Sequence, residues 1–377
     1  MMKKSLIISI ICLLLQSCMS TDAAAEVASP HDNAIQLGNA KLAVCVLVLG
    51  DPNDLTFDVD SFLNEINVFC STRSLFDYER DANLIPLTMS RGEYCVYHQE
   101  IPLECKEEVV GLRVCKGSEF QGGTECILHQ DSINKFILYL SKDGRILNCD
   151  YPQGDIKEWM DIAAVGYNSE MVDPSVFVPR KKSLYDKSWQ EVTDYMVNSL
   201  WPEFLKQSIE TITLPSFAED WVVNTLKKRF ASSCILPYVR NADMLLGKSV
   251  TEPPMEAYYF LDSINYNPDI FLKNEMNFPQ AWFLGSILKY PDGGLNDIGE
   301  TPVAQWQEYA YKKLAPAMKE RPKLLLDLLS GMSYANQLDK DTPLTETQIK
   351  NIKEGYTDDI GKIILNRNEK LLSTKGD

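Results

Sequence analysis

Short apolar runs separated by turn residues dominate the chain between residues 41 and 154. KLAVCVLVL is a continuous apolar run, EYCVYHQEIPLEC alternates apolar and polar positions, and VVGLRVCKG is rich in β-branched residues. ECILHQ, KFILYL and RILNCDY follow at close spacing. Alternation with a period of two is typical of half-buried strands, and many short strands with frequent turns indicate a sandwich or barrel. We therefore expect an antiparallel β-sandwich-like domain over residues 41–154, in which VDSFLNEINVFCS fits either a strand pair or a short helix.

After residue 155 the apolar period becomes helical. One apolar stripe in YDKSWQEVTDYMVNSLWPEFLKQSIETI consists of Tyr185, Trp189, Val192, Met196, Leu200, Phe204 and Leu205. This spacing is expected of a helix that packs against a core. Ser216 with Glu219, and Thr345 with Gln348, match the capping box that begins many helices. The sequence thus predicts an all-helical domain over residues 155–377 and an α+β fold for the whole chain.

The first 40 residues have a different pattern. Two lysines precede an apolar run over residues 6–15, which is the plan of a secretory signal. The run is shorter than the roughly 20 residues that a membrane-spanning helix needs. Residues 18–40 are small and polar without periodicity, which is typical of a flexible tether.

The end of this apolar run, Leu15-Gln16-Ser17-Cys18, resembles the lipobox of bacterial lipoproteins. The resemblance implies a signal peptide over residues 1–17, cleavage before Cys18, and a diacylglycerol on the Cys18 sulfur. An ordinary signal peptide cut near residues 23–25 is the alternative. In both cases we expect the protein outside the cytoplasm, and with the lipid we expect it anchored in the cell envelope, on the periplasmic side or at the outer-membrane surface.

Charge narrows the choice of partners. The formal net charge is −16 and the isoelectric point is near 4.8. Nucleic acids and anionic lipid surfaces attract clustered Lys and Arg side chains. We therefore expect no nucleic-acid partner.

Cysteine is the most informative residue type in the chain. Of its 10 cysteines, Cys12 lies in the predicted signal peptide and Cys18 would carry lipid, and seven of the remaining eight lie before residue 150. An even number in an oxidising compartment allows disulfides, whose pairing the spacing does not reveal. Structural disulfides, buried free thiols and reactive thiols are the three alternatives. No CxxC motif is present, and the candidate disulfide or redox cysteines are Cys95, Cys105, Cys115 and Cys126.

Other catalytic and metal-binding patterns are absent from the sequence. His31 falls in the predicted tether, and His98 and His129 fall on predicted strands without HxH or HExxH spacing. These two histidines could join a cysteine around zinc, but a solvent-facing strand position is the favoured interpretation. GxSxG, GxxxxGK[ST] and GxGxxG do not occur. The neighbouring carboxylates Glu107 and Glu108 are interpreted as solvated charges. The sequence predicts no catalytic residue, no metal site and no cofactor.

The order of segments resembles a known family. A lipobox, a β part containing GEYCVYHQEIPLECKEEVVGLRV and KFILYLSKDGRI, and helices ending in PLTETQIKNIKEGYTDDIGKIILNRNEKLLSTKGD are similar to the N-terminal extension of TlpA-type thioredoxin-like thiol-disulfide oxidoreductase lipoproteins of Bacteroidetes. In that family a thioredoxin domain with a WCxxC motif follows the extension. Here the sequence stops at Asp377, and no position matches the catalytic cysteines of that domain.

The resemblance therefore implies location and architecture without a catalytic site. We expect a non-catalytic envelope lipoprotein that binds a protein or peptide partner, in concert with a separately encoded thioredoxin-like protein. One alternative is a thiol-disulfide oxidoreductase with an unconventional cysteine pair. Another is a surface glycan-binding lipoprotein whose stacking platforms include Trp159, Trp282 and Trp306.

Overall fold

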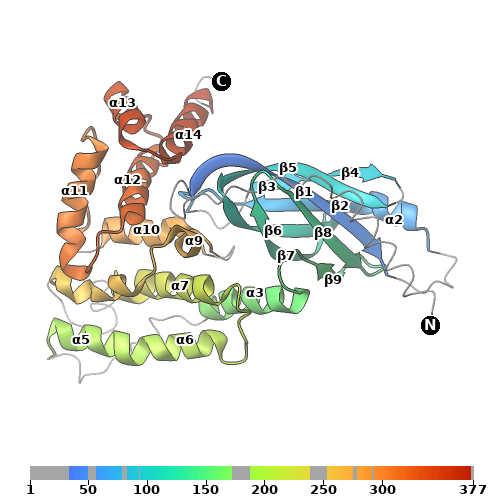
Figure 1. Cartoon of the computed structure of the whole chain (residues 1–377), viewed down its shortest axis with the longest axis horizontal. Helices are drawn as coiled ribbons and strands as arrows, with labels where there is room; N and C mark the ends of the chain where they lie inside the picture. Colours follow the sequence, from blue (N-terminus) through green and yellow to red (C-terminus); the bar gives the residue numbers. More distant parts are fainter. Residues whose placement is uncertain are drawn as a thin grey trace, which may run out of the picture. The chain divides into compact units, whose positions relative to one another are not determined.

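The strands of the described part lie between Ile35 and Asp150, and helices follow them (Figure 1). The computed structural model describes residues 34–49, 57–78, 83–92, 94–171, 187–237, 253–274, 278–290 and 293–374. The predicted signal peptide, Cys18 and His31 lie outside the described residues.

One sheet has five strands. Their order across the sheet is β4 (Thr88–Arg91), β5 (Cys95–Cys105), β1 (Ile35–Val48), β8 (Ile133–Leu140) and β9 (Ile146–Asp150). β1 is antiparallel to β5 but parallel to β8, with Val44 opposite Phe136. The prediction of purely antiparallel pairing is therefore wrong for this pair. A parallel pair needs a long crossover connection, and here the chain passes through the second sheet between β1 and β8.

The second sheet has four strands. Their order is β3 (Asn83–Pro86), β2 (Ile66–Thr72), β6 (Glu107–Lys116) and β7 (Glu119–His129), and all three pairings are antiparallel. The segment VDSFLNEINVFCS, which fitted two alternatives, forms the short helix α2 (Val59–Glu65) followed by β2. Asp58 caps this helix, because its carboxylate accepts the backbone N–H groups of Asp60 and Ser61.

Buried side chains of both sheets form one hydrophobic cluster. It includes Val44 of β1, Tyr97 of β5, Leu112 of β6 and Leu128 of β7. From residue 40 to residue 47, β1 alternates buried positions with more accessible ones, as a strand with one face on a core should. The predicted tether extends too far, because residues 35–40 already belong to β1.

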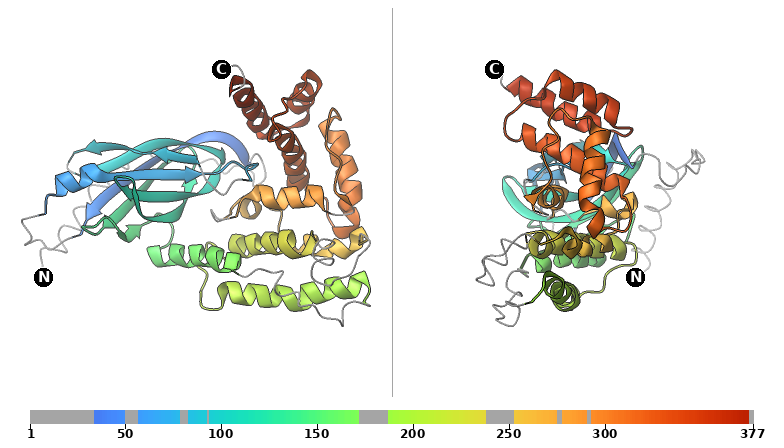
Figure 2. Two further views of the ribbon diagram at one scale, coloured as in Figure 1. Left: turned by 180° about the vertical axis from the view of Figure 1, so that it is seen from behind. Right: turned by 90° about the vertical axis from the view of Figure 1, so that its left-hand side faces the viewer.

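The helical part begins at Ile156. Its first elements are α3 (Ile156–Met171), α5 (Trp189–Tyr195), the π-helix η2 (Met196–Leu200), α6 (Trp201–Ile209), α7 (Glu219–Phe230) and the π-helix η3 (Ala231–Ile235). Its later elements are η4 (Met255–Ser263), α9 (Pro268–Phe271), α10 (Gln280–Lys289), α11 (Val303–Leu314), η6 (Ala315–Ala317), α12 (Lys323–Leu338), α13 (Glu346–Gly355) and α14 (Ile360–Thr374). Both ribbon views show α10 beside α7 and η3 (Figures 1 and 2), and α10 contacts η3.

The predicted helical stripe is confirmed in the described residues, where its buried members are Val192, Met196, Leu200 and Phe204. The capping box of Thr345 and Gln348 is also confirmed at the start of α13. The box predicted at Ser216 is wrong. α7 instead follows Ala218, which gives no side-chain cap.

The fold class α+β is thus confirmed, with two sheets followed by helices. Residues 33–377 form one compact unit, so the division into domains at residues 154 and 155 stays a prediction. The core of the helices also includes Ile35, Phe76 and Ile127 from the strand-rich part. In the described residues, no helix is both long enough and apolar enough to span a membrane.

Candidate functional site

A cavity of about 680 Å³ lies between α10 and the continuous helix formed by α7 and η3. We call it the α7–α10 cavity. Its volume is within the range of small-molecule sites, roughly 300–1,000 Å³. Its aromatic lining residues are Tyr78, Phe204, Phe278, Trp282 and Tyr290. Its polar lining residues are Ser169, Glu170, Arg229, Ser232, Ser233, Ser286 and Lys289.

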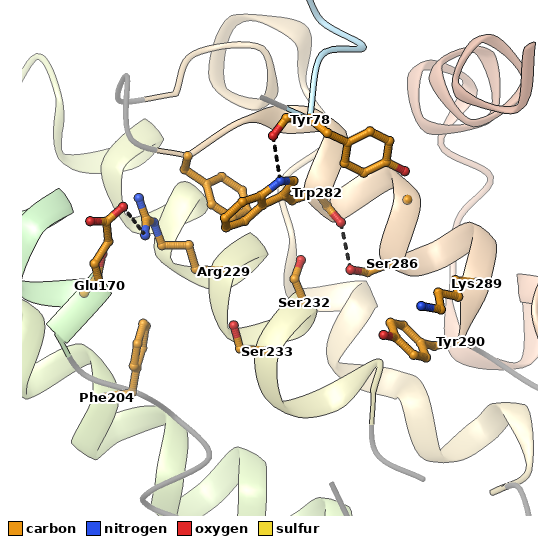
Figure 3. A pocket seen from close by; sticks show the side chains of 13 residues that line it. Tyr78, Glu170, Phe204, Arg229, Ser232, Ser233, Trp282, Ser286, Lys289 and Tyr290 are labelled. Carbon is orange, nitrogen blue, oxygen red and sulfur yellow. Dashed lines mark hydrogen bonds and ion pairs between the residues drawn. The ribbon is translucent and has the colours of Figure 1, made fainter. Parts of the chain in front are cut away.

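Two helices each direct one stripe of side chains into this cavity. The stripe of α7 and η3 consists of Arg229, Ser232 and Ser233. The stripe of α10 consists of Trp282, Ser286 and Lys289. Residues three, four and seven apart lie on the same side of a helix, so the helical fold itself brings each set together. Figure 3 shows Arg229 and Lys289 toward opposite ends, with Ser232 and Ser233 between them.

Arg229 is held from two sides. Its guanidinium lies 3.8 Å from the Glu170 carboxylate of α3 and 4.9 Å from the centre of the Phe278 ring. An aromatic face favours a planar guanidinium through a cation–π interaction. Arg229 is only 8% exposed, so its charge acts in a poorly solvated environment.

Trp282 connects the cavity to the strand-rich part. Its indole Nε1 donates a hydrogen bond of 2.9 Å to the backbone carbonyl of Tyr78, which follows β2 (Figure 3). Gly285, one turn further along α10, allows this approach: a Cβ there would lie 1.9 Å from the Tyr78 hydroxyl oxygen. Burial raises the pKa of Tyr78 to about 12.

Two serine hydroxyls of the stripes, those of Ser232 and Ser286, bond to their own helices. Ser232 Oγ donates to the carbonyl of Lys228 at 2.8 Å, and Ser286 Oγ donates to the carbonyl of Trp282 at 2.7 Å. Each hydroxyl then presents acceptor lone pairs to the cavity. The π-helical turn of η3 places Ser232 and Ser233 in this wall, and single π-turns are frequent at functional sites.

Lys289 supplies the second cation. Among the described residues its ammonium group makes no ion pair, and it lies 5.1 Å from the centre of the Tyr290 ring. The described lining thus has two cations and one carboxylate, a surplus of one positive charge in a strongly acidic chain. This surplus suits a ligand that carries negative charge.

A buried lysine fixes the helices behind the cavity wall. Lys228 is completely buried, and its ammonium donates to the Phe271 carbonyl at 2.9 Å and to Gln280 Oε1 at 3.0 Å. It also donates to Asn274 Oδ1. Because Lys228 lies on α7, Phe271 on α9 and Gln280 on α10, this network holds three helices together.

The four candidate cysteines lie apart in the sheets. Cys95 faces Val46 and Arg91, Cys105 faces Ile35, Cys115 faces Asn67 and Phe120, and Cys126 faces Val110. No candidate therefore lies opposite another candidate in a strand pair. All eight cysteines of the described part are free thiols.

Burial also makes three of these candidates poor nucleophiles. It raises the pKa of Cys95, and it raises the pKa values of Cys105 and Cys126 well above the ordinary value. Since the thiolate is the reactive form, such thiols react slowly at neutral pH. Cys105 and Cys126 fit the alternative of buried free thiols.

The two histidines in the described part of the chain lie on different sheets. His98 of β5 is exposed and hydrogen-bonds Ser90 Oγ through Nε2 at 2.6 Å. His129 of β7 lies 3.1 Å from the Glu107 carboxylate through Nδ1. Within the described ranges no cluster of three or more His, Cys, Asp or Glu residues could hold a metal ion.

The three tryptophans suggested for glycan stacking differ in exposure. Trp159 and Trp306 are buried, with 1% and 2% of their surface exposed. They belong to the core of the helical part and offer no face to a ligand. Trp282 alone of the three lines the α7–α10 cavity.

A second group of charges lies where β5 and β6 meet the helices. Glu104 accepts the backbone N–H of Leu75 at 2.8 Å, and Glu108 accepts that of Cys105 at 2.7 Å. Burial raises the pKa of Glu104 to about 7, and the negative charge of Asp77 adds to this shift. Burial raises the pKa of Glu108 to about 8, and the negative charge of Glu104 adds to this second shift. The interpretation of Glu108 as a solvated charge is therefore wrong.

Glu107 has a different environment from its neighbour. Its carboxylate pairs with His129 and lies 2.7 Å from the Lys273 ammonium. The hydrogen bond from His129, followed by those of Lys273, lowers the pKa of Glu107 to about 2. Adjacent strand residues point to opposite faces, so one carboxylate meets cations while the other is enclosed.

Sequence reasoning identified Trp282 but missed the other residues of the α7–α10 cavity. The available signal was polar residues at helical spacing inside an apolar segment. QAWFLGSILK buries Ala281, Phe283, Leu284 and Ile287, yet has Ser286 and Lys289 on the remaining face. No pattern in the sequence shows that this face meets α7 across a cavity, because that contact depends on the tertiary fold.

Neither a scan against protein-family models nor a search of curated proteins finds a match to this chain. The TlpA-type resemblance therefore rests on the sequence patterns given above.

Proposed function

We propose that this chain is a non-catalytic lipoprotein of the cell envelope that binds a peptide or protein partner in the α7–α10 cavity. The observation that supports the proposal best is the pair of polar stripes on α7–η3 and α10, which converge on one cavity of ligand size. Aromatic rings with a few convergent polar groups are the usual lining of a binding site.

The proposed location rests on the N-terminal sequence. The basic start, the apolar run and the Cys18 position fit a lipid anchor at Cys18 in the envelope. Mass spectrometry of the N-terminal peptide from envelope-extracted protein tests this. We expect a peptide that begins at lipid-modified Cys18, and an unmodified N-terminus near residues 23–25 would contradict it.

The proposed architecture follows the same resemblance. Because buried side chains of both sheets share one cluster, we propose that the sheets form a β-sandwich-like unit, as in the N-terminal extension of TlpA-type lipoproteins. An accessory role beside a separately encoded thioredoxin-like protein belongs to this proposal.

Binding can be tested with a defined probe. The full mature protein, held in detergent, is dialysed against a synthetic pool of tetrapeptides randomised at every position, and the retained peptides are quantified by mass spectrometry. We expect retention by the natural sequence and loss of retention in Ser286→Trp, whose indole would fill the cavity. Ser199→Trp is the matched control, because Ser199 is an exposed helical serine outside the cavity lining. Equal retention by all three proteins would contradict the proposal.

The redox alternative finds less support in the geometry. No candidate cysteine lies opposite another in a strand pair, and burial raises the pKa values of Cys105 and Cys126. Alkylation of the native protein at pH 7.5 distinguishes the two functions. We expect Cys105 and Cys126 to react far more slowly than in denatured protein, whereas a catalytic pair requires one rapidly reacting thiol.

Glycan binding is a second candidate because Trp282 lines the cavity together with Tyr290. Saturable quenching of tryptophan fluorescence by neutral oligosaccharides, absent in Ser286→Trp, would favour it. Unchanged fluorescence across the titration would remove it.

A further inference from the structure

We infer that the α7–α10 cavity recognises a peptide segment that carries carboxylates, either as side chains or as a free C-terminus. This inference rests on the proposed binding function and specifies its ligand.

The charges of the lining are the first step. Arg229 and Lys289 face the cavity from different helices and lie toward its opposite ends (Figure 3), with Glu170 beside Arg229. The described lining retains a surplus of one positive charge although the chain as a whole has a net charge of −16. A cavity with a positive lining in an acidic protein attracts anionic ligands and disfavours cationic ones.

The two cations differ in how they are held. Arg229 is 8% exposed and its guanidinium group lies over the Phe278 ring, so the orientation of the guanidinium group is restricted. Fixed guanidinium groups suit the planar, two-oxygen geometry of a carboxylate. Lys289 lies at the exposed end of α10, and among the described residues no carboxylate pairs with it. A bound anion would give its ammonium a partner.

The hydroxyls between the two cations define the rest of the ligand. Ser232 and Ser286 already donate to the carbonyls of their own helices, so they accept hydrogen bonds from a ligand. A ligand with anionic groups at its ends and N–H donors between them matches this arrangement. That pattern belongs to a peptide with acidic residues, whereas inorganic phosphate has no comparable donors. Trp282 and Tyr290 add aromatic surface for an apolar side chain.

The test uses the tetrapeptide pool in matched forms, one with free and one with amidated C-termini, and compares the charge of retained peptides. We expect enrichment of about tenfold for each added carboxylate, up to two, because a hydrogen bond to a charged group contributes on that order. Lys289→Met should lose about tenfold of the affinity for acidic peptides while retaining neutral ones. Lys206→Met is the control, since Lys206 is an exposed helical lysine outside the cavity.

The outcomes separate this inference from the proposed function. Retention without charge preference, still blocked by Ser286→Trp, would overturn the inference and leave the binding function standing. If the natural protein retains no peptide that Ser286→Trp fails to retain, both the inference and the proposed binding function are overturned. A disaccharide of glucuronic acid that binds through Lys289 while acidic peptides do not would also overturn the peptide assignment.

Discussion

The adjacent residues Glu107 and Glu108 show how strongly local environment decides what a side chain does. Glu107 meets His129 and Lys273, which lower its pKa to about 2. Glu108 is enclosed beside Glu104, and burial raises its pKa to about 8. The two residues are identical in type and adjacent in sequence. Their environments differ because neighbouring strand residues point to opposite faces of the sheet.

The Glu108 carboxyl should make the protein less stable as pH rises. Its ordinary pKa of 4.5 is raised to about 8 in the fold, so the folded protein keeps a proton that the unfolded chain releases. Between about pH 5 and pH 8 the free energy of unfolding should therefore fall, and it should level off above about pH 8. Glu108→Gln keeps the acceptor oxygen but does not ionise. We expect it to raise the free energy of unfolding at pH 8 by about 1–2 kcal/mol and to flatten the slope, as measured by urea denaturation at several pH values.

Glu107→Gln is the matched control for this measurement. The lowered pKa of Glu107 contributes stability that is present above its ordinary pKa and is lost as pH falls toward about 2. This variant should be less stable than the natural protein at pH 7. A Glu108→Gln protein that keeps the natural pH slope would contradict the assignment of Glu108.

Helices and strands could be predicted where local pattern alone determines them. The burial of Val192, Met196 and Leu200 is predicted correctly, because apolar residues at helical spacing lie on one face of the helix and that face packs against the core. The helix start at Thr345 is predicted correctly because all residues of a capping box lie within four positions of the sequence. The capping box predicted at Ser216 is wrong because the same residue pattern can occur in a turn that precedes a helix. Here the helix begins after Ala218.

Features that depend on contacts far apart in sequence could not be predicted. The parallel pairing of β1 with β8 joins segments about 90 residues apart. The α7–α10 cavity needs two helices and the segment around Tyr78 to meet. Residue types at each position were visible in the sequence, but their partners were not.

The helices around the cavity should depend on the buried ammonium of Lys228. Lys228→Met would leave the Phe271 carbonyl and the Gln280 oxygen without the donor that Lys228 provides. We expect a loss of about 2–4 kcal/mol in the free energy of unfolding, because each buried acceptor left unpaired costs about 1–3 kcal/mol. Lys206→Met, at an exposed ion pair, should change it by less than about 1 kcal/mol. A Lys228→Met protein as stable as this control would contradict the structural role of the network.

The strand-rich and helical parts are joined by specific polar contacts. Arg367 of α14 lies 2.6 Å from Asp77, which follows β2, and 2.6 Å from Asp339, which follows α12. The backbone N–H of Leu37 in β1 also donates to Asp359 at 2.8 Å. These links, together with the shared core, explain why residues 33–377 form one compact unit.

Removing the link at Arg367 should weaken this whole unit. We expect Arg367→Met to lower the free energy of unfolding by about 1–2 kcal/mol, since two hydrogen-bonded charge pairs disappear but both aspartates can still reach water. Differential scanning calorimetry measures the effect. Arg321→Met, which removes an exposed pair with Glu308, should shift the transition much less. Equal shifts of the unfolding transition in the two variants would show that the ion pairs of Arg367 contribute no more to stability than an exposed ion pair does.

The most direct test of ligand binding in the α7–α10 cavity is hydrogen exchange of the full mature protein with and without a peptide retained from the tetrapeptide pool. The account predicts slower exchange in η3 and α10, which form the two walls, and unchanged exchange in β6. Slower exchange confined to the strands, or no change in η3 and α10 at saturating peptide, would contradict it.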